Sequence, residues 1–351
     1  MKAVILAGGM GTRLRPVTGD RPKPMVPLLG KPLMEHIIAL LRTQGFDDIC
    51  AALRYRAGDI MAHFGDGSRF GVHMQYRLEQ EALGTAGAVK NCGDFCGDED
   101  VLVISGDAAC DFDLAFLLAE HRRRNAAVTL ALYRHPEPLR YGLAVTDGED
   151  NIRGFVEKPD WGRVVTDLVN TGIYIVSPRA MALVPAGQEF DFARDLFPLL
   201  LERGETLLGL PMTGYWCDVG TPLSYYRCCA DALEGRLKID LPETFRPAAA
   251  SEEDCPCQAG ESLDCACHDR AELMGILSEL LLDMGADYSD GLRLHGKGYE
   301  LHISPLASRS SLRISVQSED AEFARQLALS ARDLANALDQ SSGSQPQQLP
   351  R

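Results

Sequence analysis

The chain has 351 residues, of which 46% are hydrophobic and 24% charged, a composition typical of a globular protein with about two domains. A formal net charge of −15 argues against a nucleic-acid backbone as partner, and no apolar run approaches the ~20 residues of a membrane span. The N-terminus lacks the features of a signal peptide, so the eleven scattered cysteines predict reduced thiols and a cytoplasmic location.

The first predicted element is a short buried strand, Lys2–Leu6, followed by a glycine-rich loop. The loop reads Leu6-Ala7-Gly8-Gly9-Met10-Gly11-Thr12-Arg13 and continues to Lys23. Its glycines allow backbone N–H groups to approach phosphate oxygens, and Arg13 and Lys23 add positive charge. The spacing fits neither a dinucleotide fingerprint nor a Walker A loop. A glycine-rich turn without a ligand is the alternative, but it would leave both cations unexplained.

Strands that alternate with helices follow the loop and predict an α/β fold with a mainly parallel sheet. A helix over Pro32–Gln44 precedes strands at Asp48–Leu53, Val72–Tyr76, Val101–Ile104 and Val128–Tyr133. Shorter strands are predicted at 143–145, 152–156 and 170–176, then Trp216–Thr221 and a helix from Pro222 to about Gly235. Ligands bind at the carboxyl ends of such strands, so the residues after the first and fourth strands mark the expected site.

The rest of the chain predicts a linker and a second, smaller unit. Residues 239–269 hold two Cys-x-Cys pairs and little apolar periodicity, which is typical of a linker. Residues 270–338 predict helices at Ala271–Met284 and Glu322–Leu338, a hairpin around Gly296-Lys297-Gly298 and a strand at Leu312–Val316. The Ser- and Gln-rich residues 339–351 predict a disordered tail.

The glycine loop resembles the signature of the sugar-1-phosphate nucleotidyltransferases, G-G-x-G-T-R-L-x-P-x-T followed by P-K-P. The matching positions are Gly8, Gly9, Gly11, Thr12, Arg13, Leu14, Pro16, Thr18, Pro22, Lys23 and Pro24. The resemblance covers about residues 1–238 and implies a Rossmann-like α/β nucleotidyltransferase domain. Residues 270–338 weakly resemble the last domain of phosphohexomutases, which implies a small α+β domain. Most phosphate-contacting residue types of that domain are absent, so a structural or regulatory module is predicted rather than mutase activity.

Two aspartates are candidates for a Mg²⁺ site. Asp107 follows a buried strand in Ser105-Gly106-Asp107, and Asp218 lies in Trp216-Cys217-Asp218-Val219-Gly220-Thr221. Mg²⁺ takes one or two carboxylates together with phosphate oxygens. The resemblance implies that Asp107 and Asp218 are the family's two metal ligands. Asp111 and Asp113 are better explained as turn and helix-cap carboxylates.

The segment Leu83-Gly84-Thr85-Ala86-Gly87-Ala88 is a candidate nucleobase site. Its small residues would let a flat base lie against the backbone, although they equally suit a tight helix start. The resemblance places the nucleobase here, which assigns Gly84 and Thr85 to nucleotide binding. A carboxylate at Glu79 could accept two adjacent donors of guanine, which favours GTP over UTP or dTTP. A solvated surface glutamate is the alternative.

The resemblance also implies a sugar-phosphate site on later strands. Glu157 corresponds to a glutamate that binds sugar hydroxyls, and Lys158 to a lysine that binds the sugar phosphate. An exposed ion pair is the simpler alternative for these two neighbours. Gly142, preceded by Tyr141, and Asn170 correspond to the remaining sugar-binding positions.

The resemblance therefore implies an enzyme that joins a nucleoside triphosphate to a sugar 1-phosphate and releases pyrophosphate. The attacking phosphate oxygen is already anionic, so positioning and charge neutralisation must carry catalysis. Lys23 is expected to neutralise the α-phosphate, Arg13 the departing phosphates, and Mg²⁺ to bridge them. GTP with mannose 1-phosphate is favoured, and glucose 1-phosphate with UTP or dTTP is the alternative. A non-catalytic nucleotide-sugar sensor is the alternative from another class, and the sequence leaves room for a homo-oligomer.

One further cluster could hold a metal ion. Cys255, Cys257, Cys265 and Cys267, with His268, lie close together in the predicted linker. Structural Zn²⁺ sites typically use Cys-x-x-Cys spacing rather than Cys-x-Cys. Free linker thiols are therefore the favoured interpretation.

Overall fold

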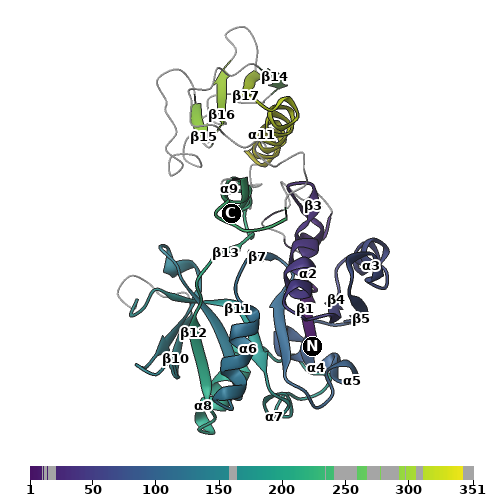
Figure 1. Cartoon of the computed structure of the whole chain (residues 1–351), viewed down its shortest axis with the longest axis vertical. Helices are drawn as coiled ribbons and strands as arrows, with labels where there is room; N and C mark the ends of the chain where they lie inside the picture. The colour runs from purple at the N-terminus through teal and green to yellow at the C-terminus, as the bar shows by residue number, and fades with distance from the viewer. Residues whose placement is uncertain are drawn as a thin grey trace, which may run out of the picture. The chain divides into compact units, whose positions relative to one another are not determined.

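The computed structural model describes residues 1–9, 11, 14, 21–157, 164–233, 235–240, 259–266, 277, 292–296, 298–305 and 311–342. The chain divides into two units, Met1–Gly11 with Arg21–Val219, and Thr12–Asp20 with Gly220–Arg351 (Figure 1). Within the described ranges, every helix is too short or too polar to span a bilayer.

A nine-stranded sheet forms the centre of the first unit, with the order β10-β9-β11-β6-β1-β4-β5 and with β8 joining β11 to β12. The central strand β1 (Lys2–Ala7) runs parallel to β4 (Asp48–Leu53) and β6 (Val101–Ser105), and β4 runs parallel to β5 (His73–Leu78). The other strands are β8 (Val128–Arg134), β9 (Gly142–Thr146), β10 (Ile152–Glu157), β11 (Leu168–Val176) and β12 (Leu207–Pro211). β11 is antiparallel to β6. The predicted α/β fold with a mainly parallel central sheet is confirmed.

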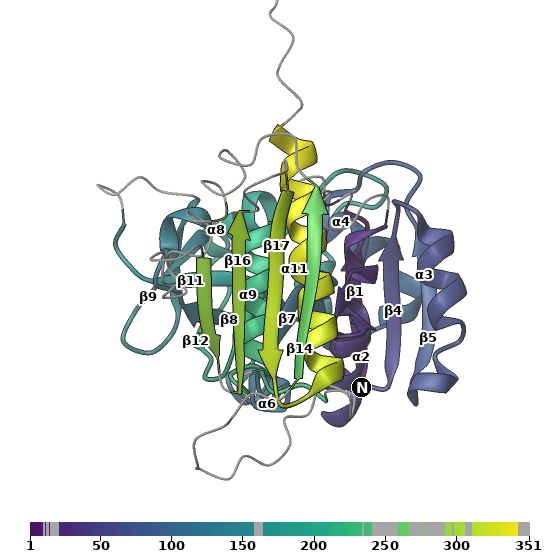
Figure 2. The ribbon, with the colours of Figure 1, turned by 90° about the horizontal axis from the view of Figure 1, so that it is seen from above.

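Helices cover both faces of this sheet, because the consecutive residues Ala3, Val4 and Ile5 of β1, which point to opposite faces in turn, are all buried. Ala3 and Ile5 face a core that also contains residues of α2 (Leu33–Thr43), α3 (Ala57–Phe64) and α6 (Leu114–Arg123). Val4 faces the opposite core, with residues of α4 (Gly84–Asn91), α5 (Gly93–Cys96), α7 (Pro178–Met181) and α8 (Phe197–Glu202). Figure 2 shows β1, β4 and β5 side by side, with α3 against β5.

Several short elements connect these layers. They are η2 (Lys23–Met25), β2 (Pro27–Leu28), β3 (Lys31–Pro32), η3 (Ser68–Phe70), β7 (Ala108–Cys110), η4 (Pro138–Arg140), the π-helical turn η6 (Phe192–Leu196) and β13 (Trp216–Asp218). β7 and β13 form a separate two-stranded antiparallel ribbon. β7 begins at the residue after Asp107, and β13 ends at Asp218, so the ribbon adjoins one predicted metal aspartate and contains the other.

The second unit contains α9 (Pro222–Leu233) and a four-stranded antiparallel sheet in the order β14-β17-β16-β15. Its strands are β14 (Ala259–Ala266), β15 (Leu292–Gly296), β16 (Tyr299–Pro305) and β17 (Ser311–Ser318). The helix α11 (Ala321–Ser342) packs along β14 and β17 (Figure 2). Ile303, Ile314 and Ala328 lie in the core between the sheet and this helix.

The structure confirms some predictions for the second unit and contradicts others. The predicted hairpin is confirmed, because β15 and β16 pair antiparallel with Gly296 opposite Tyr299. The linker interpretation of residues 239–269 is wrong for Ala259–Ala266, which pair with β17 throughout. Likewise, α11 continues to Ser342, so the predicted disordered tail is wrong for residues 339–342. Most of the helix predicted at Ala271–Met284 lies outside the described residues.

Candidate active site

The glycine loop leaves the carboxyl end of β1, next to the end of β6. The Gly106 N–H donates to the carbonyl of Leu6 at 2.8 Å, which joins the two strand ends beyond their last paired residues. Ala7 is the last residue of β1, and Gly8 and Gly9 follow it with exposed or half-buried backbone. The side chains of Arg54 and Glu79 lie against Gly8. Thr12 and Arg13 lie outside the described residues.

Lys23 is the centre of an ion triad at this edge of the sheet. Its ammonium donates to Asp107 Oδ2 at 2.7 Å and to Asp218 Oδ1 at 3.2 Å. The Lys23 side chain is only 8% exposed, whereas each aspartate keeps 34% exposure, so the carboxylates remain reachable from solvent. Gly11 lies against the aliphatic stem of Lys23. The three predicted residues are therefore brought together although they are far apart in the sequence.

Electrostatic interactions within the triad shift the pKa values of Lys23 and Asp107 toward their charged forms. Burial disfavours the charged ammonium, but the charges of Asp107 and Asp218 outweigh it and hold the Lys23 pKa above its usual value. Burial would likewise raise the Asp107 pKa, yet the Lys23 charge and hydrogen bonds from Lys23 and Ser105 hold it below the usual range. The site is thus a fixed cation between anionic oxygens.

The ribbon of β7 and β13 explains how the two aspartates meet. Asp218 pairs with Ala108, the residue after Asp107, in the antiparallel register. The Val219 N–H donates to the Asp107 carbonyl at 3.3 Å and closes this end of the ribbon. The backbone geometry therefore sets the spacing of the two carboxylates.

The predicted nucleobase segment lies at the start of α4, and Glu79 is tied to it. The Glu79 Oε2 accepts a hydrogen bond from the Leu83 N–H at 3.3 Å. Burial raises the pKa of Glu79, while this hydrogen bond and the Arg54 charge oppose the shift. The carboxylate is half-buried beside Gly8 rather than fully solvated. The surface-glutamate alternative is thereby weakened on geometric grounds.

Other residues of this segment make contacts within the protein. The Ala86 and Gly87 N–H groups donate to the Phe190 carbonyl at 3.0 and 2.9 Å. The Thr85 hydroxyl donates to Asp191 Oδ2 at 2.7 Å and accepts from the Phe192 N–H at 2.9 Å. Its side chain therefore anchors α4 to the start of η6. Only the backbone of Gly84 and Thr85 stays a candidate for contact with a nucleotide.

The predicted sugar-site residues converge from three neighbouring strands. Glu157 pairs with Gly142 between β10 and β9, and its Oε2 lies 2.8 Å from the point where a β-carbon of residue 142 would stand. Val169 pairs with Leu143, so the antiparallel register places Asn170 beside Gly142 on the other side. The Asn170 Oδ1 accepts from the Gly172 N–H at 3.1 Å and the Tyr174 hydroxyl at 3.0 Å. Lys158 lies outside the described residues.

An aromatic cluster joins Tyr141, the residue before Gly142, to Trp216, two residues before Asp218, and the sequence pattern indicated only part of it. Tyr141 packs against Trp216 and His135 with ring centroids 5.4 and 4.7 Å apart, and Tyr133 completes the group. Burial, reinforced by the Asp218 charge, raises the pKa of Tyr141 to about 12. The buried Trp216 indole N–H finds no acceptor among the described residues. The one sequence feature that could have indicated this cluster is the presence of aromatic residues at the ends of several predicted strands.

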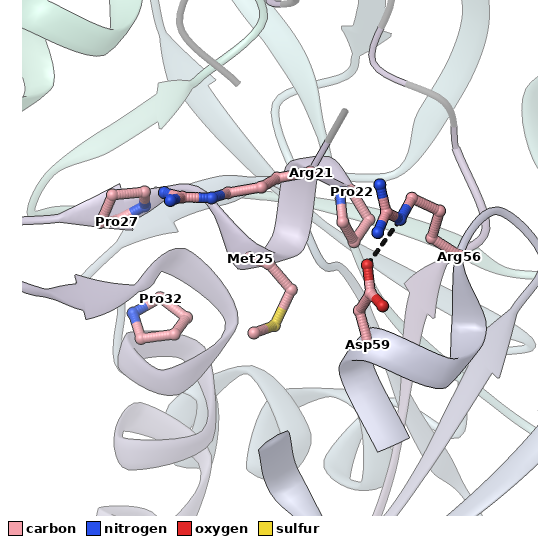
Figure 3. A pocket seen from close by; sticks show the side chains of 7 residues that line it. All are labelled: Arg21, Pro22, Met25, Pro27, Pro32, Arg56 and Asp59. Atoms are coloured by element: carbon pink, nitrogen blue, oxygen red, sulfur yellow. Dashed lines mark ion pairs between the residues drawn. The ribbon is translucent and has the colours of Figure 1, made fainter. Parts of the chain in front are cut away.

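Two other features lie outside this constellation. An open cavity of about 470 Å³ borders η2 (Figure 3), lined by Arg21, Pro22, Met25, Pro27, Pro32, Arg56 and Asp59. Its Arg56–Asp59 ion pair spans 2.6 Å. Of the predicted cysteine cluster, the structure describes Cys265 alone, whose buried thiol donates to Asn336 Oδ1 at 2.9 Å. Within the described ranges, no three His, Cys, Asp or Glu side chains gather as a metal cluster.

Comparison with known proteins agrees with this geometry. Residues 2–235 match the family model described as nucleotidyl transferase. A UTP–glucose-1-phosphate uridylyltransferase of Synechocystis is 39% identical over 69% of this chain and 66% of its own length. A mannose-1-phosphate guanylyltransferase of Mycobacterium tuberculosis is 37% identical over 66% of this chain and 65% of its own length. The chain thus spans about two thirds of the length of these curated relatives.

A solved structure shares the fold of the first unit. It is a candidate glucose-1-phosphate thymidylyltransferase from Bacillus anthracis in complex with sucrose. It is 29% identical to this chain, with a TM-score of 0.61, and the match covers 70% of this chain and 98% of that structure.

Proposed function

Because the chain belongs to the nucleotidyl transferase family, we propose that it transfers a nucleotidyl group from a nucleoside triphosphate to a sugar 1-phosphate and releases pyrophosphate. The observation that carries this proposal is the buried Lys23 ammonium held between Asp107 and Asp218 at the carboxyl end of the central strands. A buried cation at this point suits a reaction in which negative charge is redistributed among phosphate oxygens.

The chain's own residues can position both substrates. Gly8 and Gly9 follow β1 with half-buried or exposed backbone, which could contact phosphate oxygens of the nucleotide. Glu157 and Asn170 flank Gly142 and could hold sugar hydroxyls by accepting and donating hydrogen bonds. An oxygen of the sugar phosphate then attacks the α-phosphorus in line, and because it is already anionic, no residue need remove a proton. Lys23 would neutralise the α-phosphate during this step.

The donor set at the site fits a divalent cation. The Lys23 ammonium already occupies a position shared by two carboxylates, which shows that their oxygens converge on one cation-sized volume. Mg²⁺ takes one or two carboxylates with water and phosphate oxygens. Asp107 and Asp218 would hold it, and the bound ion would supply further neutralisation of phosphate charge.

For the specific substrates, we favour GTP and mannose 1-phosphate. The half-buried Glu79 beside Gly8 can accept two adjacent N–H donors, which guanine has and uracil or thymine lacks. The guanylyltransferase relative supports this choice. The uridylyltransferase relative, with slightly higher identity, supports glucose 1-phosphate with UTP as the second candidate.

A matrix of pyrophosphate-release assays tests these proposals. GTP, UTP and dTTP are each paired with mannose 1-phosphate and glucose 1-phosphate in the presence of Mg²⁺. We expect the highest kcat/KM for GTP with mannose 1-phosphate. A preference for UTP with glucose 1-phosphate would replace the substrate assignment but keep the reaction. Binding of a nucleotide sugar without release from any pair would instead favour a non-catalytic sensor.

The variant Lys23→Ala tests the role of the buried cation. Removing a preorganised charge from the reacting phosphate should lower kcat by about 10²–10³-fold. Lys2→Ala, which removes an ammonium paired with Glu99 instead, is the matched control and should leave kcat unchanged. Near-normal turnover of Lys23→Ala with an intact fold by circular dichroism would contradict the assignment.

A further inference from the structure

The β7–β13 ribbon is too short to fix its own register. Each strand has three residues, and an isolated two-stranded pair of this length is not stable by itself. A slip of one residue would turn the Asp218 side chain to the opposite face of β13, because side chains alternate along a strand. The site therefore depends on whatever holds the ribbon at the end far from the carboxylates.

Asp111 closes that far end with its side chain as well as its backbone. Its N–H donates to the Tyr215 carbonyl at 3.2 Å, and its Oδ1 accepts from the Tyr215 N–H at 2.6 Å. The register Trp216 opposite Cys110 continues to Tyr215 opposite Asp111. The carboxylate thus takes the role that a backbone carbonyl would have in a regular ladder.

Gly214 makes room for this arrangement. Its φ of +114° is a conformation that L side chains rarely adopt, and a β-carbon there would clash with Asp111 Oδ1. The Asp111 carboxylate therefore fills the space beside a residue that must lack a side chain. Asp113, two residues later, does something different, because its Oδ1 accepts from the Phe116 N–H at 2.8 Å and caps α6.

We propose that Asp111 is a positioning residue of the active site, which fixes the register of β13 on β7 and thereby the spacing of Asp107 and Asp218. The proposal rests on the proposed function in that these aspartates hold Mg²⁺. It assigns to Asp111 a role that the sequence pattern did not reveal, since both Asp111 and Asp113 read as ordinary turn or cap carboxylates.

Trp216 provides a direct readout of the register. It lies in β13, is 5% exposed, and shares the chain with a single other tryptophan, Trp161. In a Trp161→Phe background, acrylamide quenching therefore reports Trp216 alone. Asp111→Ala should increase the quenching constant severalfold and raise the Mg²⁺ concentration for half-maximal pyrophosphate release by about 10–100-fold. Asp111→Asn, whose Oδ1 can still accept from Tyr215, should restore both values to within about twofold of the parent.

Two more variants complete the test. Asp113→Ala should lose thermal stability through its cap but keep the parent's quenching and Mg²⁺ dependence. Gly214→Ala should reproduce Asp111→Ala, because its methyl group displaces the same carboxylate, and it provides a second measurement if Asp111→Ala does not fold. The proposal would be overturned if the quenching constant, or the Mg²⁺ dependence, stayed unchanged in both Asp111→Ala and Gly214→Ala. It would also be overturned if Asp111→Asn failed to restore the parent's quenching constant and Mg²⁺ dependence. If the parent protein released no pyrophosphate, the proposed function would be contradicted instead. The quenching constants of the variants would still test whether Asp111 fixes the register of β13.

Discussion

At the scale of single residues, Glu79 carries the proposed choice of base. Its carboxylate is held by the Leu83 N–H and lies beside Gly8, so it is oriented before any ligand arrives. Preorganisation of this kind lowers the entropy cost of binding. Partial burial raises the pKa of this carboxyl above its usual value, so it takes up a proton at higher pH than a free glutamate, and protonation would remove an acceptor proposed for guanine.

Glu79→Gln should weaken discrimination in favour of GTP. Glutamine keeps the shape but replaces one acceptor oxygen by a donor, so one of the two charge-assisted hydrogen bonds, worth about 1.5–3 kcal/mol, is lost and the other loses its charge. The ratio of kcat/KM for GTP to that for UTP should fall by about 10–100-fold. Glu81→Gln, at an exposed position two residues away, should leave the ratio unchanged. An unchanged ratio in Glu79→Gln would assign base recognition elsewhere.

The sequence pattern predicted which residues belong to the candidate site, but it did not predict the contacts that these residues make. Lys23, Asp107 and Asp218 could be named from a signature and from strand ends. That Lys23 pairs with both aspartates could not, because the contact depends on partners 84 and 195 positions away. The resemblance assigns Thr85 to nucleotide binding, but no local pattern indicated that its hydroxyl donates to Asp191 at the start of η6.

At the scale of elements, α4 is held in place by the carbonyl of Phe190. Gly84, its first residue, has φ +69°, and a β-carbon there would lie 2.6 Å from that carbonyl oxygen. The helix can therefore approach η6 closely only because residue 84 is glycine. This docking sets where the proposed base-binding backbone lies.

Gly84→Ala should consequently destabilise the protein and weaken nucleotide binding. A strained backbone and a close contact together should cost about 1–3 kcal/mol, measured by urea unfolding. Gly93→Ala is the matched control, since Gly93 starts α5 without a positive φ and has open space around it. That control should be neutral or slightly stabilising. Equal stability of the two variants would contradict the role of Gly84.

Elements with strong local periodicity were predictable, and elements defined by distant partners were not. The helix over residues 33–43 and the hairpin of β15 and β16 have regular apolar spacing or a glycine turn. Among the β14 residues whose burial is described, Leu263 and Cys265 contribute to the core, and the polar residues Ser262 and Asp264 beside them are exposed. Its strand character comes from pairing with β17, about fifty positions later. The three-residue strand β7 was not predicted for the same reason, and the pairing of β13 with it was not predicted either.

At the scale of the whole molecule, the chain buries separate hydrophobic cores in its two units. Two cores pack on the faces of the large sheet, and a third lies between the small sheet and α11, with no residue in common. Separate cores allow separate unfolding, so a single free energy of unfolding need not describe the chain.

Leu41→Ala and Ile314→Ala test this independence, because each fully buried side chain belongs to a different unit. Each truncation should cost about 2–5 kcal/mol. Scanning calorimetry should show two transitions, of which each variant lowers one, and Mg²⁺ with the preferred nucleotide should raise only the transition lowered by Leu41→Ala. Val165→Ala, at a side chain that is 67% exposed, should move neither. A single transition lowered by both core variants would show that the units unfold together.

The ion triad of Lys23, Asp107 and Asp218 also bears on the order in which a metal ion and a nucleotide would bind. Oxygens that hold the Lys23 ammonium at 2.7 and 3.2 Å cannot at the same time give their full charge to a divalent ion. Under the proposed function, a metal ion held by Asp107 and Asp218 would therefore have to exchange with this ammonium. A nucleoside triphosphate would offer the displaced ammonium a new anionic partner, so binding of the metal together with the nucleotide would be favoured. Release of pyrophosphate would let Lys23 pair with the aspartates again.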